Sequence, residues 1–147
     1  MSSSFSDLPL VYSCSGCSNA AQLANALALH LDRAQCAEMS CISGVGGGVA
    51  PLVRLAQSGR PILALDGCPL ACAKACLAQA GVSPSRHVIL SEHGVRKRLH
   101  TEYSADELAA LLPVEQLSDS SKSSSFRLQK VRVFSMKCLQ IRCHHTL

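Results

Sequence analysis

Cysteine is the residue type that offers the clearest chemistry in this sequence. The chain has 147 residues, of which 9 are cysteines. Five of them follow short apolar runs, namely Cys14, Cys17, Cys41, Cys68 and Cys72. Thiolate sulfur is a soft ligand that selects zinc, iron-sulfur clusters or copper(I) over magnesium and calcium. In a reducing compartment such clusters bind metals or carry out redox work, and an odd number of cysteines fits poorly with a complete disulfide framework.

The elements that must position these cysteines alternate along the chain. Apolar runs of strand length are found at 8–13, 37–42, 61–66 and 87–90. Helical spacing or helix start and stop signals are found at 19–33, 49–59, 69–81 and 104–112. Ser104 and Glu107 form a capping box that begins the last of these helices. Regular alternation predicts a single small α/β domain, with a mostly parallel four-stranded sheet flanked by helices.

The carboxyl-terminal part of the chain has a different composition. Residues 1–117 carry 8 Lys and Arg against 9 Asp and Glu, whereas residues 118–147 carry 6 against 1. We therefore expect a domain over 1–117 and a Ser-rich linker with a basic, poorly ordered tail over 118–147. Because the positive charge lies in the tail and the chain has 0 Trp, 2 Tyr and 3 Phe, nucleic acid is not expected as a partner of the domain.

Parallel strands would bring the five cysteines to one edge of the sheet. All carboxyl ends of such strands lie at the same edge, where ligands bind in the crevice beyond it. Cys72 would lie one helical turn beyond Cys68, about 6 Å along the axis. Cys36 precedes the second strand, about 16 Å from Cys41 at strand rise, and Cys76 is about 12 Å along the helix from Cys68. These last two are predicted to pack in the core.

Four thiolates around zinc in a tetrahedron would account for this set, with the choice between Cys17 and Cys41 for the fourth position left open. Helix amino termini after Cys17 and around Cys68 would favour the thiolate forms. The alternative is a redox or electron-transfer protein, which would use Cys14 and Cys17 as a C-x-x-C dithiol or the whole set for an iron-sulfur cluster. A dithiol alone would leave Cys41, Cys68 and Cys72 unexplained.

The segments C-S-G-C-S, C-I-S-G-V-G-G and above all D-G-C-P-L-A-C-A-K-A resemble the DGC-domain family of bacterial proteins. The resemblance spans residues 9 to 115, and D-G-C-P-x-x-C is its most specific part. It implies a small cytosolic α/β domain with a zinc-binding cysteine site and no settled biochemical activity. The positions that match are Cys14, Cys41, Cys68 and Cys72, and Cys17 departs from the pattern.

Several other polar or glycine-rich segments could either serve a binding site or have an ordinary structural role. The Gly-rich segment 43–48 could cradle an anion, but it lacks the Lys-Ser/Thr of a P-loop, so a tight turn is favoured. Asp66 could hydrogen-bond the ligand loop or cap the following helix. His93 could serve the site, yet a solvated loop histidine is the simpler interpretation. The run 96–98 (R-K-R) is expected to be a solvated face.

The remaining signals concern location and reaction class. No stretch offers the ~20 consecutive apolar residues of a membrane span. The segment MSSSFSDLPL lacks a basic region followed by an apolar one, which predicts a cytoplasmic protein. No general base, nucleophile pair or substrate pocket is evident, so the sequence assigns no reaction and leaves open whether the protein is an enzyme.

Overall fold

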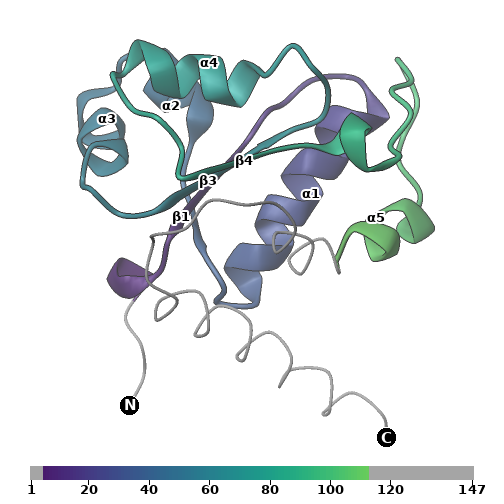
Figure 1. Ribbon diagram of the computed structural model, residues 1–147, viewed down its shortest axis with the longest axis horizontal. Coiled ribbons are helices and arrows are strands. Elements are labelled where there is room, and N and C mark those ends of the chain that lie inside the picture. Colours follow the sequence, from purple (N-terminus) through teal and green to yellow (C-terminus); the bar gives the residue numbers. More distant parts are fainter. Residues whose placement is uncertain (1–4, 113–147) are drawn as a thin grey trace, which may run out of the picture.

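The molecule is an α/β domain in which four parallel strands lie between two layers of helices (Figure 1). The computed structural model describes residues 5–112. Its strands are β1 (Leu10–Ser13), β2 (Glu38–Met39), β3 (Ile62–Asp66) and β4 (Arg86–Ile89). Its α-helices are α1 (Asn19–Arg33), α2 (Ile42–Gly46), α3 (Ala50–Ala56), α4 (Cys72–Gln79) and α5 (Ala105–Leu111). Two short 3-10 helices are η1 (Phe5–Asp7) and η2 (Leu90–His93). The predicted fold class is confirmed, and the segment 118–147, expected to be poorly ordered, lies outside the described residues.

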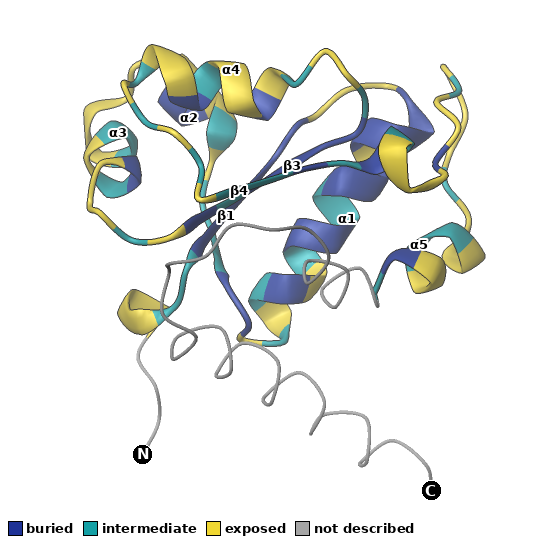
Figure 2. Cartoon of the chain, in the orientation of Figure 1, coloured by how far each residue is buried: buried dark blue, intermediate teal, exposed yellow. Residues whose placement is uncertain are grey.

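The central strands β1 and β3 are buried on both faces, as apolar strands of parallel sheets usually are. Val11 and Leu65 face α1, and Leu10 and Ala64 face the layer of α2, α3 and α4. The inner face of α1 is almost wholly buried (Figure 2). Each fully buried leucine there, such as Leu23, contributes about 2 kcal/mol to the free energy of folding.

The strand order β2-β1-β3-β4 creates a switch point between β1 and β3. From β1 the chain crosses through α1 to β2 at one side, and then through α2 and α3 to β3 at the other side. The loops that leave the carboxyl ends of β1 and β3 therefore lead to opposite faces of the sheet (Figure 1). In open α/β sheets the crevice between two such loops is where ligands bind. Cys14 follows β1 and Cys68 follows β3, so both stand at this crevice.

Residues 43–46 of the glycine-rich segment belong to helix α2, and Gly47 and Gly48 form the predicted turn directly after it. The glycines of α2 allow close helix packing: a Cβ on Gly44 would overlap Leu52 Cδ1, and one on Gly46 would lie 2.9 Å from Cys76 Sγ. These contacts give the two glycines of α2 a packing role. The second strand is also shorter than predicted, so that Cys41 is the residue before α2 and lies beyond the end of β2.

Helix α4 begins at Cys72, three residues later than the predicted start at Pro69. Residues 68–71 form a turn in which the Ala71 amide donates to the Cys68 carbonyl, and Ala71 has a left-handed backbone with φ of 51°. The predicted rise of one helical turn between Cys68 and Cys72 is therefore wrong. Asp66 explains the late start, because its carboxylate accepts hydrogen bonds from the amides of Ala73 and Lys74 at 2.8 and 3.2 Å. Of the two interpretations of Asp66, capping of the helix is confirmed.

The predicted capping box at α5 is present and gives a direct test of local stability. Ser104 Oγ accepts from the Glu107 amide at 3.1 Å, and Glu107 Oε2 accepts from the Ser104 amide at 2.8 Å. Replacing Ser104 by alanine should lower the free energy of unfolding by about 1 kcal/mol, because a helix amide loses its acceptor. Urea denaturation would measure this loss. Ser58→Ala, at an exposed serine, is the control and should change stability by less than about 0.5 kcal/mol.

Candidate metal centre

Cys14 is the buried member of the cysteine site, with 7% of its surface exposed. Its backbone amide extends the β1–β3 ladder by donating to the Leu65 carbonyl at 2.9 Å. The amide of Gly67, in the loop after β3, donates to Cys14 Sγ at 3.1 Å. This hydrogen bond joins the two loops of the switch point through the sulfur atom.

Burial raises the pKa of the Cys14 thiol to about 11. The Gly67 hydrogen bond opposes this rise, and the charges of Asp66, Cys72 and Cys68 add to it. Cys68 and Cys72 thus lie near enough to Cys14 for their charges to act on its sulfur. Cys68 is half-buried, and Cys72 is exposed in the first turn of α4. Three of the five predicted ligands therefore lie at the same edge of the sheet, after β1, after β3 and at the start of α4.

Cys41 and Cys17 lie in different surroundings from these three. Cys41 Sγ accepts from the Gly44 amide at 3.4 Å and thereby caps α2. Its charge acts on Tyr12, whose pKa is raised chiefly by burial. Cys17 is exposed and lines a separate pocket beside α5. Within residues 5–112, no three Cys, His, Asp or Glu side chains are already grouped so that they could hold a metal ion.

The two cysteines excluded on spacing lie away from the crevice at the switch point. Cys36 is buried in the core on the α1 side of the sheet, before β2. Cys76 lies on α4 with its sulfur close against Gly46 of α2. The close contact between α2 and α4 gives Cys76 a packing role, as its distance along the helix from Cys68 predicts.

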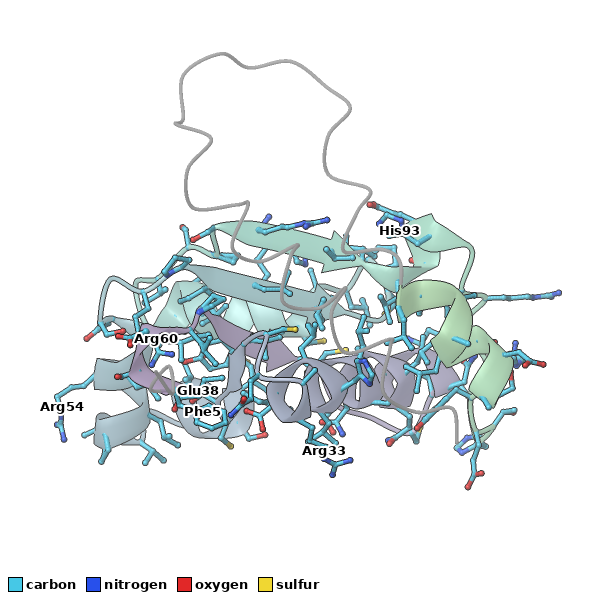
Figure 3. The ribbon with its side chains drawn as sticks, turned by 90° about the horizontal axis from the view of Figure 1, so that it is seen from below. Phe5, Arg33, Glu38, Arg54, Arg60 and His93 are labelled. Carbon is cyan, nitrogen blue, oxygen red and sulfur yellow. The ribbon has the colours of Figure 1, made fainter. Side chains whose placement is uncertain are left out.

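Asp66 connects the helix that carries Cys72 to the fourth strand. Besides capping α4, its Oδ2 lies 2.8 Å from His87 Nε2, and the carboxylate is almost fully buried. The sequence places His87 among the histidines around the fourth strand but gives no sign of this pairing. His93, by contrast, is exposed at the end of η2 and points away from the body of the domain, as expected for a solvated histidine (Figure 3).

A cation also reaches the site from the segment after η2. Lys97 Nζ donates to Cys68 Sγ at 3.4 Å. The segment is held by Asn19, which is fully buried at the start of α1. The backbone amide of Asn19 donates to the Arg98 carbonyl, and its side-chain Oδ1 accepts from the Arg98 backbone amide at 2.7 Å. Arg98 also pairs with Glu107 of α5. The run 96–98 is thus only partly the solvated face that the sequence predicts. Local sequence patterns do not indicate these roles of Asn19 and Lys97, because their partners are remote in sequence.

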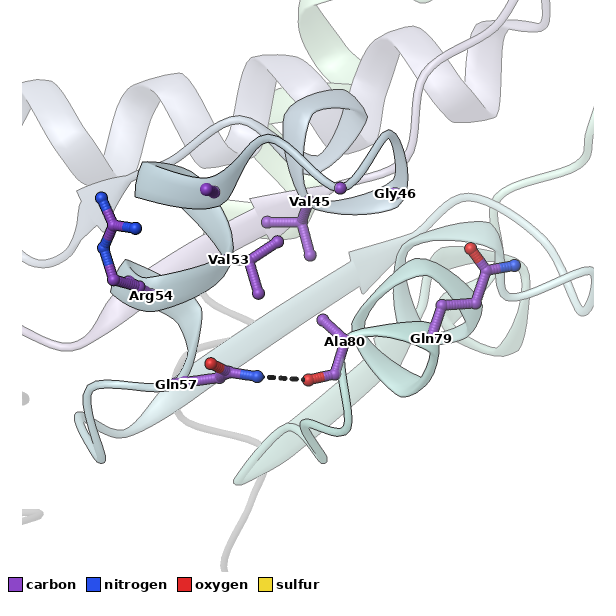
Figure 4. Close-up of a pocket in the computed structure, with 9 residues that line it drawn as sticks. Val45, Gly46, Val53, Arg54, Gln57, Gln79 and Ala80 are labelled. Atoms are coloured by element: carbon purple, nitrogen blue, oxygen red, sulfur yellow. Dashed lines mark hydrogen bonds between the residues drawn. The ribbon is translucent and has the colours of Figure 1, made fainter.

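At the other end of the sheet, polar contacts are structural rather than part of the cysteine site. Arg60 pairs with Glu38 at 2.7 Å and donates to the carbonyls of Phe5 and Leu8. These side chains lie together near η1, remote from His93 (Figure 3). A groove of about 570 Å³ lies between α3 and α4, where Gln57 donates to the Ala80 carbonyl at 2.9 Å (Figure 4). It holds no cysteine, so it is separate from the candidate centre.

The raised pKa of Cys14 predicts how stability depends on pH in the metal-free protein. An unfolded cysteine loses its proton near pH 8.5, whereas folded Cys14 keeps it to about pH 11. The protonated thiol stabilises the folded state fully at pH values below the unfolded pKa of about 8.5. This stabilisation is lost as the pH rises towards the folded pKa of about 11. This loss should reach about 2 to 3 kcal/mol. Urea denaturation near pH 8 and near pH 10.5, with chelator present, should show a smaller decrease for Cys14→Ala than for wild type. An equal decrease in the free energy of unfolding for wild type and Cys14→Ala would contradict the raised pKa of Cys14.

A parallel sheet with cysteines at its switch point, and the D-G-C-P-L-A-C segment that follows its third strand, define the class of protein. The family model of the DGC domain matches residues 10–114, and the chain belongs to this family. Over 104 residues the chain is 65% identical to the "Anaerobic and virulence modulator AnvM" of Pseudomonas aeruginosa. The aligned region covers 71% of this chain and 79% of that protein. No solved structure matches the chain significantly.

The helices of the domain are short or polar in comparison with a membrane span. Between residues 5 and 112, none of them combines the length and the apolar character that crossing a bilayer requires.

Proposed function

We propose that this protein binds one zinc ion through cysteine thiolates at the switch point of its sheet. Cys14, Cys68 and Cys72 are the ligands from this chain on which the proposal rests. The observation that supports it is the placement of the three cysteines at one edge of the sheet: Cys14 follows β1, Cys68 follows β3, and Cys72 begins α4. Three soft sulfur donors suit zinc and exclude a preference for magnesium or calcium.

Polar groups beside the sulfurs can donate hydrogen bonds to thiolates, and at Cys14 the donor opposes the burial that raises the pKa of the thiol. Cys14 accepts from the Gly67 amide and Cys68 accepts from the Lys97 ammonium group. Cys72 lies at the amino end of α4, where the helix dipole is positive. Donors of this kind orient metal ligands and compensate their negative charge. Zinc held in this way supplies a cross-link between loops and, if one coordination position is exchangeable, a Lewis acid.

Metal binding requires the side chains to move from their present positions, since no three ligands in the described part of the chain are already grouped for a metal. Cys68 is half-buried and Cys72 is exposed, so both can change rotamer without disturbing the core. An off-rotamer side chain costs about 1 kcal/mol. Zinc binding to thiolate sites provides about 10 to 16 kcal/mol at neutral pH. The rearrangement is therefore small beside the binding energy.

The fourth position falls to Cys41, which lies beyond the end of β2 at the same edge of the sheet, or to an exchangeable ligand. Cys17 lines a pocket in which Cys14, Cys68 and Cys72 take no part. The same difference in surroundings weakens the C-x-x-C dithiol alternative, because Cys14 is buried while Cys17 is exposed. An iron-sulfur cluster remains the alternative that would use the same three sulfurs.

Metal analysis of the full chain, purified anaerobically without added metal, tests the proposal. We expect about one zinc ion per chain and no visible absorption. Iron with visible absorption would instead support the cluster. A protein that holds neither metal, and that does not take up zinc when it is supplied, would reject the proposal.

A further inference from the structure

One buried carboxylate closes the loop that carries two of the candidate ligands. Asp66 has 1% of its surface exposed, and its Oδ1 accepts from the Ala73 amide at 2.8 Å. Its Oδ2 accepts from the Lys74 amide at 3.2 Å and lies 2.8 Å from His87 Nε2. The loop between the carboxylate and the two amides spans residues 67–72, which include both cysteines of D-G-C-P-L-A-C.

His87 reaches this carboxylate from outside the loop. It lies on β4 opposite Ala64 of β3, and Asp66 is two residues further along β3. Alternate residues of a strand share a face, so Asp66 and His87 lie on the same face of the sheet. Helix α4 covers this face, where its Leu77 lies in one apolar cluster with Ala64 (Figure 1). The fourth strand is therefore joined to the start of α4 through a single carboxylate.

The buried carboxylate needs the donor that His87 supplies. An ionised carboxylate only accepts hydrogen bonds, and it is costly to bury unless its oxygens are bonded. The Nε2 atom of His87 therefore takes the donor role, beside the two backbone amides of α4. Without this donor, the Asp66 side chain can turn towards water at lower cost. The first turn of α4 then loses the acceptor for its amides.

The loop also contains a residue in an unfavourable backbone conformation. Ala71, directly before Cys72, has a left-handed φ of 51° although it is not a glycine. Conformations of this kind persist only where the surrounding contacts hold them. The hydrogen bonds of Asp66 are such contacts, so the shape of the loop depends on them.

We propose that His87 is a positioning residue for the zinc site, because its hydrogen bond to Asp66 fixes the loop of residues 67–72. Both Cys68 and Cys72 stand on this loop. His87 acts on the spacing of their sulfurs and is not itself a ligand. The inference rests on the proposed zinc site, and it adds to that site a residue of the fourth strand.

The zinc affinity of the full-length chain, measured by competition with a chromophoric chelator, tests this role. Loss of a group that orients metal ligands usually weakens binding by about 10- to 100-fold. His87→Leu should lie near tenfold, about the lower limit, because His87 acts through Asp66. His87→Gln, whose side-chain amide can still donate to the carboxylate, should restore most of the affinity. His93→Leu, at an exposed histidine, is the control and should bind zinc as wild type does.

A purely structural role of His87 predicts a different result. It would lower the midpoint of urea denaturation and, while the chain is folded, leave the zinc affinity unchanged. The double variant Asp66→Asn with His87→Leu should bind zinc no more weakly than Asp66→Asn alone, because both changes break the same connection. Additive losses in the double variant, or wild-type affinity in His87→Leu, would overturn the inference while the zinc proposal stands.

Amide hydrogen exchange in the metal-free chain separates this inference from the zinc proposal. The amides of Ala73 and Lys74, followed by NMR, should exchange faster in His87→Leu than in wild type or His87→Gln, because their acceptor is less firmly held. This result together with no zinc uptake by wild type would reject the zinc site and support the control of the loop by His87. Unchanged exchange in His87→Leu would overturn the inference.

Discussion

A variant in which both Cys68 and Cys72 are replaced by serine should purify with less than a tenth of the zinc that the wild-type chain carries. Removing two of three thiolates leaves Cys14 alone at the crevice, and a serine hydroxyl is a poor zinc ligand at neutral pH. The expected weakening is several orders of magnitude, since structural zinc sites derive about 10 to 16 kcal/mol from their full ligand set. Elemental analysis and competition with a chromophoric chelator would measure it.

The fold of that variant should survive, because neither side chain is part of the buried core. Cys76→Ala is the matched control, since Cys76 lies on the same helix but packs against Gly46. It should retain its zinc. Full zinc occupancy in the double variant, with circular dichroism unchanged, would show that the metal is held elsewhere.

Gly67→Ala should lower the free energy of unfolding by about 3 kcal/mol, the upper range for overpacking. A Cβ at this position would lie 2.6 Å from the carbonyl carbon and oxygen of Ala20 and 2.8 Å from the Ala21 nitrogen. These are backbone atoms at the start of α1, which cannot move aside as a flexible side chain would. The switch-point loop would have to shift, and its hydrogen bond to Cys14 Sγ would shift with it.

Gly81→Ala distinguishes this close approach from the general effect of glycine replacement. Gly81 has a left-handed φ of 71° with no atom within 4 Å of the added Cβ. Its replacement should cost about 1 kcal/mol, from backbone strain alone. Urea denaturation of the two variants provides the comparison. If Gly67→Ala cost no more than Gly81→Ala, the contact with α1 would not be the reason for a glycine in this motif.

Local patterns in the sequence determined the elements and the cysteines that stand near their ends. The apolar spacing from Ala20 to Leu31 predicts α1, and the pair Ser104 and Glu107 predicts the start of α5, because both signals act between residues three or four apart. The alternation of strands and helices predicts the parallel sheet. Because parallel strands end at the same edge of a sheet, this prediction places Cys14 and Cys68 together at that edge.

Tertiary contacts decided the arrangement within that edge. Asp66 sets the start of α4 by capping amides seven and eight residues further on, so Cys72 lies differently from the predicted helix. The glycines 44 and 46 form a helix because Leu52 and Cys76 pack against them. Lys97 reaches Cys68 across 29 positions of sequence. Such partners are brought together by the folding of the whole chain, and no periodicity or spacing within a segment encodes them. For the same reason the sequence could not separate Cys17, in its own pocket beside α5, from the cysteines at the switch point.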